Sequence, residues 1–254
     1  MFPRILHIYG PLWIHGYGMM IAVGFLIFIY FLYNNSIRKK IISDEILFNT
    51  LFLGLMSGII GGRLITIIYE WNSFSENIWQ IFYPWIGGFG ILGSILGVMI
   101  TVPIYLKIKK VPVMELFDII AIYAGLLEGF GRFGCLFAGC CHGMPAKCFC
   151  SIIFTNPNGL APLNIPLHPA QIYSSLASFL VFIFMFYRAK YFEYKKGELL
   201  FTFLMLSSFF RFLIDFVRGD RDFIAEFHTI SYYQTIAILI FIFSFISFIV
   251  ARKK

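Results

Sequence analysis

Long apolar stretches recur along the whole chain and are separated by short polar connections. A helix needs about 20 mostly apolar residues to cross a bilayer core about 30 Å thick. By that measure the pattern predicts seven membrane-spanning helices, at residues 17–33, 46–69, 85–106, 113–130, 169–187, 198–217 and 230–251. The third is broken by glycines and the fourth holds three acidic residues. The predicted fold class is an all-α integral membrane protein.

Lysine and arginine cluster after alternate predicted spans. The clusters after spans one, three, five and seven hold 13 of the 20 basic residues: Arg38, Lys39, Lys40, Lys107, Lys109, Lys110, Arg188, Lys190, Lys195, Lys196, Arg252, Lys253 and Lys254. Basic residues next to spans mark the cytoplasmic side. We therefore expect the N-terminus outside and the C-terminus in the cytoplasm, which an odd number of spans also requires.

Composition separates the chain from soluble and disordered proteins. Hydrophobic residues make up 59% and charged residues 13%, and the mean hydropathy is +0.83. Soluble chains carry about 25% charged residues, and disordered ones fewer apolar residues. Because most of the basic residues lie in the cytoplasmic clusters, the net charge of +7 is a topology signal, and we expect no nucleic-acid partner.

One polytopic domain is expected over residues 1–254, with a small outer-face loop insertion at about 131–168. The first apolar run precedes its basic cluster, which is the reverse of a secretory signal peptide. Glycines four residues apart, at 54–62, 93–97 and 125–129, predict close helix packing. The denser runs at 87–90 and 129–134 predict irregular backbone around a cavity that opens outward.

Four arginines lie inside predicted spans or at their outer ends: Arg63, Arg132, Arg211 and Arg218. An arginine at mid-bilayer costs about 2.5–3.5 kcal/mol on insertion scales, so each needs a partner. The acidic candidates are Glu128, Asp215, Asp220 and Asp222. Helical spacing predicts that Asp215 pairs with both Arg211 and Arg218. A structural ion-pair network and an anion site for a phospholipid head group both remain open. Arg4, Lys147 and Arg221 are expected to be ordinary surface charges.

All histidines and cysteines fall on the predicted outer side: His7, His15, His142, His168, His228, Cys135, Cys140, Cys141, Cys148 and Cys150. His7 and His228 are expected to be hydrogen-bonded interface residues. The cysteine spacing matches no standard zinc pattern. Disulfides are the default in an oxidising compartment, so we expect them here, with a Cys/His metal site as the alternative.

Ordered motifs along the chain resemble those of one family. They are His15-Gly16-Tyr17-Gly18, Gly61-Gly62-Arg63, the glycine-rich segment 87–97, Gly131-Arg132-Phe133-Gly134-Cys135 followed by Gly139 and Gly143, His168-Pro169-Ala170-Gln171-Ile172-Tyr173, and Arg211 followed by Asp215 and Arg218. With the seven spans, this set resembles bacterial prolipoprotein diacylglyceryl transferases over about residues 10–244.

The resemblance implies a reaction and a location. The family transfers the diacylglyceryl group of phosphatidylglycerol to the lipobox cysteine thiol of prolipoproteins and releases glycerol phosphate. It acts in the bacterial cytoplasmic (inner) membrane. The implied partners are phosphatidylglycerol, prolipoprotein signal peptides and membrane lipids. No cofactor and no metal are implied.

The resemblance also implies site residues. Arg132 and Arg211 would stabilise the leaving phosphate, and His142 or His15 is the candidate base. The implied substrate-binding residues are His15, Tyr17, Arg63, Gly134, Gly139, Gly143, His168, Gln171, Asp215 and Arg218.

Several family residues are replaced in this chain. Leu92 stands where the family has histidine, Cys135 and Ala138 where it has asparagine, Cys140 and Ser174 where it has glutamate, and Ser207 where it has tyrosine. These departures keep two alternatives open. One is a protein of the same fold that uses a different lipid or acceptor. The other is a non-enzymatic lipid- or metal-binding membrane protein or, least favoured, a transporter.

Overall fold

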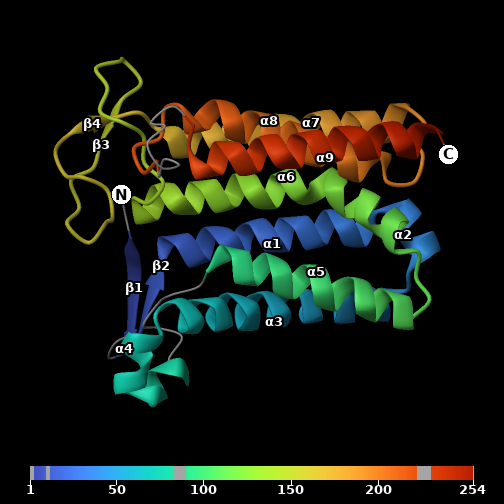
Figure 1. Cartoon of the computed structure of the whole chain (residues 1–254), viewed down its shortest axis with the longest axis horizontal. Helices are drawn as coiled ribbons and strands as arrows, with labels where there is room; N and C mark the ends of the chain where they lie inside the picture. The colour runs from blue at the N-terminus through green and yellow to red at the C-terminus, as the bar shows by residue number, and fades with distance from the viewer. Residues whose placement is uncertain (1–2, 10–11, 83–89, 222–229, 254) are drawn as a thin grey trace. The chain divides into compact units, whose positions relative to one another are not determined.

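The computed structural model describes residues 3–9, 12–82, 90–221 and 230–253, and most of them are helical (Figure 1). The contacts divide the chain into two compact units. The first unit comprises residues 1–34 and 117–254, and the second comprises residues 35–116. Each unit is described by itself below.

The first unit is built from five long helices. They are α1 (Gly16–Asn34), α6 (Val113–Ala138, of which the first four residues belong to the second unit), α7 (Ala170–Tyr191), α8 (Glu198–Asp215) and α9 (Tyr232–Lys253). Two short antiparallel sheets accompany them: β1 (Arg4–Tyr9) with β2 (Leu12–His15), and β3 (Ile152–Ile153) with β4 (Pro166–Leu167). Arg4 pairs with His15 in the first sheet, and Ile152 pairs with Leu167 in the second.

A buried carboxylate of α6 fixes where α8 begins. Gly197 precedes α8 and takes a left-handed conformation with φ +85°. Asp118 accepts hydrogen bonds from the backbone N–H groups of Gly197 (2.6 Å) and Leu200 (2.8 Å). These donors would otherwise have no partner inside the helix. A side chain from a neighbouring helix therefore caps α8.

The two ends of the helices in the first unit carry different groups. At one end, Arg188 of α7 pairs with Glu198 of α8 at 2.5 Å, and Lys195 Nζ donates to the Arg252 carbonyl of α9 at 2.7 Å. The other end carries the segment at 139–169, which we call the outer loop. Met144 N donates to the Val217 carbonyl there at 2.9 Å, which joins the outer loop to the end of α8.

The second unit is a close pair of helices with short flanking elements. It contains α2 (Ser36–Ile41), α3 (Asp44–Tyr69), α4 (Trp71–Glu76), the 3₁₀ helix η1 (Ile78–Phe82) and α5 (Ile91–Ile108). A Cβ added at Gly93 or Gly97 would meet the backbone of α3, so the predicted close packing is confirmed there. Arg63 donates to the carbonyls of Gln80 (2.6 Å) and Ile81 (3.2 Å) and thereby fastens η1 to α3.

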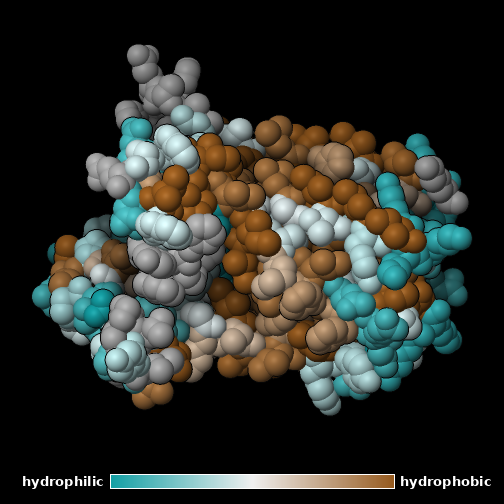
Figure 2. Space-filling model, turned by 90° about the horizontal axis from the view of Figure 1, so that it is seen from below, coloured by the Kyte–Doolittle hydropathy of each residue, from teal (hydrophilic) through white to brown (hydrophobic). Residues whose placement is uncertain are grey.

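Five of the described helices are long and apolar enough to cross a membrane: α1, α3, α5, α7 and α9. Exposed large hydrophobic residues cover their surfaces, including Phe48, Phe52, Ile68, Ile100 and Ile104 on α3 and α5. Figure 2 shows hydrophobic side chains across the middle of one face. The chain is thus a multi-pass membrane protein. The helices α6 and α8 coincide with the other two predicted spans, but the count of seven and the orientation stay predictions.

One backbone expectation is wrong. Helix α6 continues unbroken through the glycines at 129–134 to Ala138, so the outer loop begins at Gly139 instead of about 131. The reason is close packing within the first unit. A Cβ at Gly125 would lie 2.6 Å from the Ser178 carbonyl oxygen of α7, and one at Gly129 would lie 2.5 Å from the Phe179 ring. The other glycine run, apart from Gly90, lies outside the described residues.

Candidate active site

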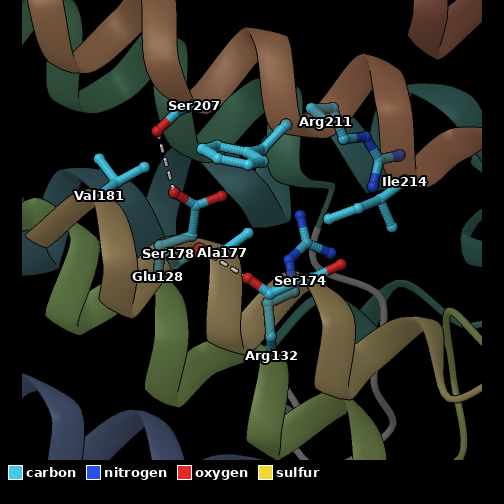
Figure 3. Close-up of a pocket in the computed structure, with 10 residues that line it drawn as sticks. Glu128, Arg132, Ser174, Ala177, Ser178, Val181, Ser207, Arg211 and Ile214 are labelled. Carbon is cyan, nitrogen blue, oxygen red and sulfur yellow. Dashed lines mark hydrogen bonds between the residues drawn. The ribbon is translucent and has the colours of Figure 1, made fainter.

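A narrow pocket lies between α6, α7 and α8 of the first unit (Figure 3). Its cavity volume is about 20 Å³, which is room for about one water molecule. The lining residues are Glu128, Arg132, Ser174, Ala177, Ser178, Val181, Ser207, Phe210, Arg211 and Ile214. Four of them carry polar hydroxyl or carboxylate groups, two carry guanidinium groups, and the rest are apolar. The pocket therefore combines two guanidinium groups with one carboxylate, and the rest of its wall is uncharged.

Arg211 enters this pocket from α8 with part of its guanidinium group unsatisfied. Its Nη2 lies 3.7 Å from Asp215 Oδ1, one helical turn away, and its guanidinium carbon lies 4.9 Å from the centre of the Tyr233 ring. Its buried Nη1 has no hydrogen-bond partner among the residues that the structure describes. A buried donor without a partner is costly, so a ligand acceptor at this position would be favoured.

Arg132 reaches the same space from α6. Figure 3 shows the guanidinium groups of Arg132 and Arg211 directed into the pocket from different helices. Arg132 and Arg218 are both close enough to act on Arg211 electrostatically, and Asp215 and Cys141 act in the opposite direction. Two guanidinium groups and one carboxylate line the pocket, so its formal charge is positive, as an anion site requires.

The carboxylate of Asp215 organises the cations around it, although not in the predicted way. It is fully buried and accepts a 2.5 Å hydrogen bond from Ser231, and its Oδ2 lies 3.5 Å from Arg221 Nε. Arg221 also donates to Gln234 at 3.0 Å, so it is part of the site's support instead of an ordinary surface charge.

The predicted pairing of Arg218 with Asp215 is wrong. Helix α8 ends at Asp215, so Arg218 no longer lies on its face. Arg218 instead forms a bidentate pair with Asp220 at 2.8 and 2.6 Å. The other acidic candidate, Asp222, lies outside the described residues.

Glu128 was considered in the sequence only as a partner for arginine, yet it lines the pocket. Its Oε2 accepts a 3.3 Å hydrogen bond from Ser207. Ser174 and Ser207 line the pocket as well. A carboxylate inside an apolar span was the available signal for Glu128.

Three thiols cluster where α6 runs into the outer loop. The sulfur atoms of Cys135, Cys140 and Cys141 all lie within 4.8 Å of one another. Hydrogen bonds from the Cys135 and Cys140 thiols, together with Arg218 and Arg132, hold the pKa of Cys141 well below its usual range. The hydrogen bond to Cys135 raises the pKa of Cys140. All five cysteines are free in the structure, so the expected disulfides are not formed.

The outer-loop motif residues hold the loop against α7. Gln171 is almost fully buried and donates to the Cys140 carbonyl at 2.9 Å. Gly143 N donates to the His168 carbonyl at 3.1 Å, and a Cβ at Gly143 would collide with that carbonyl. Gly139 has φ +77°, a backbone conformation that favours glycine. These residues fix the backbone of the outer loop beside the pocket, and they are not among the pocket-lining residues.

The remaining predicted residues lie elsewhere. His142 Nδ1 is 3.1 Å from the Gly143 carbonyl, and His142 is not among the pocket-lining residues. His15 is exposed on β2. Tyr17 packs on Gly134, whose added Cβ would be 3.0 Å from the Tyr17 ring, and it lies near the three thiols. Arg63 and Leu92 belong to the second unit.

Comparison with known proteins places these features in one family. A family model described as prolipoprotein diacylglyceryl transferase matches residues 3–250. A phosphatidylglycerol–prolipoprotein diacylglyceryl transferase of Clostridium tetani is 36% identical over 246 residues, covering 96% of this chain and 97% of the relative. An enzyme of the same name, numbered 2, from Clostridium perfringens is 33% identical and covers 82% of this chain and 80% of the relative. Another from Clostridium botulinum strain Langeland is 32% identical and covers 100% of this chain and 99% of the relative.

Proposed function

The chain belongs to the prolipoprotein diacylglyceryl transferase family, and we propose that it transfers the diacylglyceryl group of phosphatidylglycerol to the lipobox cysteine of prolipoproteins. The names of its relatives support this donor and this acceptor. The observation that carries the proposal is the buried Nη1 of Arg211, which has no hydrogen-bond partner among the described residues and lies in a pocket that Arg132 also lines. One phosphate oxygen of the donor lipid, about the size of the single water molecule for which the cavity has room, supplies the missing acceptor.

The reaction makes the phosphate the group that must be stabilised. The acceptor sulfur attacks the glycerol carbon that carries the phosphate ester, a carbon–sulfur bond forms, and the carbon–oxygen bond breaks. Glycerol phosphate leaves with the electron pair of that bond, so negative charge grows on its oxygen. Donors fixed in advance at that oxygen lower the barrier, and Arg132 and Arg211 are proposed for this role.

The thiol proton must also be removed, because the thiolate is the nucleophile. Glu128 is the carboxylate that lines the pocket beside the two arginines, and we propose it as the proton acceptor. His142 is the second candidate, since it lies in the outer loop next to Cys141. Comparing Glu128→Gln with His142→Gln separates the two, because only the variant that lacks the base is expected to lose most of its transfer rate at neutral pH. The proposed reaction uses no cofactor or metal.

The supporting residues divide into two groups. Asp215 and Arg218 are proposed to set the charge around Arg211, and His168, Gln171, Gly139 and Gly143 to position the outer loop over the lipid. Tyr17, Gly134 and His15 are proposed to contact the incoming signal peptide at the end of α1. Arg63 is proposed to support substrate binding indirectly, by holding η1 against α3 within the second unit.

We propose one membrane domain with seven spans in the bacterial cytoplasmic membrane, with the N-terminus outside and the C-terminus inside. The meeting of Arg188, Lys195 and Arg252 at one end of the first unit supports this sidedness. A C-terminal fusion to alkaline phosphatase is expected to be inactive and one to a fluorescent protein bright. A membrane-impermeant maleimide is expected to label outer-loop cysteines in intact cells. The opposite labelling pattern would refute the topology.

The transfer reaction is tested in membranes that contain the chain, with phosphatidylglycerol and a lipobox peptide as substrates. Arg132→Ala and Arg211→Ala are expected to abolish transfer while the protein still accumulates. Arg188→Ala is the matched control, because this arginine also lies on a helix of the first unit and pairs with a carboxylate, at the opposite end. Full activity of both pocket variants would refute the proposed anion site.

A further inference from the structure

A second group of potential ligands lies in the outer loop, away from the pocket. The sulfur atoms of Cys148 and Cys150 are 2.7 Å apart, and Cys148 Sγ is 3.9 Å from His168 Nδ1. All three ligand atoms lie within 4.8 Å of one another. The Tyr173 hydroxyl is 3.1 Å from Cys150 Sγ and 3.4 Å from His168 Nδ1. Four polar groups thus converge on one point from two separate segments.

The fold builds this convergence through backbone hydrogen bonds. Ser151 donates to the Cys148 carbonyl through both its backbone N–H (3.0 Å) and its hydroxyl (2.8 Å), which forms a tight turn. Phe149 between the two cysteines is fully exposed, whereas both cysteines are half-buried. The two thiols therefore face the same side of the turn, away from Phe149.

Strand pairing brings the histidine to these thiols. Ile152 and Ile153 of β3 pair with Leu167 and Pro166 of β4, so His168 follows directly after the paired segment. His168 is fixed on both sides of its peptide unit, since its N–H donates to the Met144 carbonyl at 2.9 Å and its own carbonyl accepts from Gly143. The imidazole is therefore presented from a rigid backbone.

Two thiolates and one imidazole are a donor set that suits a thiophilic divalent cation. In a tetrahedral zinc site, bonds of about 2.3 Å to sulfur and 2.0–2.1 Å to nitrogen place sulfur and nitrogen about 3.5 Å apart and two sulfurs about 3.8 Å apart. The 3.9 Å between Cys148 Sγ and His168 Nδ1 is about 0.4 Å longer than the sulfur–nitrogen value. The two sulfurs must separate by about 1 Å, which rotation of two half-buried side chains allows.

We propose that Cys148, Cys150 and His168 bind one divalent metal ion, with zinc as the best match, and that Tyr173 or a water molecule completes the coordination. The ion would tie the outer loop to the first turn of α7. Ser174, which lines the pocket, lies one residue beyond Tyr173, so the site is structural and supports the pocket from outside. The proposed metal site does not depend on the transferase activity. A failure of one proposal would therefore leave the other standing.

The three thiols of Cys135, Cys140 and Cys141 are the natural control. They offer three sulfurs and no histidine nitrogen, so the two sites differ in ligand composition. X-ray absorption of the unmutated, zinc-loaded chain is expected to give two sulfur and one or two nitrogen or oxygen neighbours. A shell of three sulfurs would overturn the assignment, and this measurement needs no variant that must fold.

Metal binding itself is measured on the full chain, purified in detergent with reductant and stripped with a chelator. Addition of Co²⁺ is expected to produce thiolate-to-cobalt charge-transfer bands that saturate at one ion per chain. Cys148→Ser and Cys150→Ser are expected to lose the bands, whereas Cys140→Ser and Cys141→Ser keep them. No bands with free thiols, bands that persist in Cys148→Ser, or bands lost only in Cys141→Ser would each overturn the proposal. Metal-free chains isolated with a Cys148–Cys150 disulfide would do so too.

Discussion

Arg211 and Asp215 form an ion pair along α8 that does not satisfy the hydrogen-bonding capacity of either side chain. Nη2 and Oδ1 are 3.7 Å apart, and neither Arg211 Nη1 nor Asp215 Oδ1 has a hydrogen-bond partner in the described part of the chain. Asp215 also accepts a hydrogen bond from Ser231, and its Oδ2 lies 3.5 Å from Arg221 Nε. The carboxylate therefore holds Arg211 in place without neutralising the positive charge around it, and a phosphate group can complete the arrangement.

Asp215→Asn is expected to destabilise the protein by about 3–5 kcal/mol, because it leaves buried cations without their counter-charge. The measurement is thermal unfolding in detergent. Ser231→Ala is the control, since it removes one hydrogen bond to Asp215 and the cap of α9, for an expected cost of about 1–2 kcal/mol. An Asp215→Asn protein as stable as the parent would show that the network contributes nothing.

Arg211→Lys is expected to lower the turnover of transfer by about 10²–10³-fold, the range found when one oxyanion donor is lost. Lysine keeps the positive charge but lacks the planar fork that can reach Asp215 and a phosphate together. Initial rates at saturating phosphatidylglycerol measure this. Arg188→Lys should leave the rate unchanged. If Arg211→Lys were fully active, charge alone would suffice and the geometric argument would be wrong.

Gly125→Ala is expected to lower the unfolding temperature, whereas Gly131→Ala should be tolerated. The added Cβ at Gly125 would lie 2.6 Å from the Ser178 carbonyl oxygen, whereas the one at Gly131 has no described atom within 4 Å. Alanine at position 131 should even favour the helix by up to about 1 kcal/mol. Equal unfolding temperatures for the two variants would contradict the close packing of α6 on α7.

Cys141 is expected to be the most readily alkylated member of its three-thiol cluster at neutral pH. An ordinary thiol has a pKa of about 8.5 and loses reactivity as the pH falls below it. The pKa of Cys141 is lowered, so its thiolate persists and its alkylation rate should change little from about pH 9 to pH 6. Cys140, whose pKa is raised, should stay protonated and unreactive.

Peptide-level mass spectrometry after brief treatment with a small alkylating reagent separates the two residues. Arg218→Gln should shift the Cys141 profile toward higher pH, because one of the cations that favour the thiolate is lost. A Cys141 profile that falls with the ordinary thiol titration would contradict the lowered pKa.

Hydropathy predicted where the helices lie, because lipid exposure forces long apolar segments. The glycine pattern gave the wrong expectation at 129–134, because the sequence cannot tell a glycine that breaks a helix from one that admits a neighbour such as Phe179. The i, i+4 spacing predicted the Arg211–Asp215 pair correctly. It failed for Arg218, because whether α8 continues past Asp215 depends on the outer loop, with which Val217 and Gly219 form hydrogen bonds.

Some of the site residues could likewise be predicted from the sequence, and others could not. Arg132 and Arg211 were found from charge inside apolar spans and from motif order. The contact between Glu128 and Ser207 could not be predicted, because 79 positions separate them in the chain and only the packing of α6 against α8 brings them together. The role of Gln171 as a support was equally invisible, because its partner Cys140 lies 31 positions away in the chain.

The most direct test is transfer by the purified full chain in detergent, with a lipobox peptide and one lipid at a time, followed by intact mass. Phosphatidylglycerol should add one diacylglyceryl group to the peptide, and phosphatidylethanolamine none. A peptide with serine in place of the lipobox cysteine should stay unmodified, and Arg211→Ala should abolish the gain. No gain with phosphatidylglycerol, while the Clostridium tetani relative is active in the same assay, would contradict the proposed transfer.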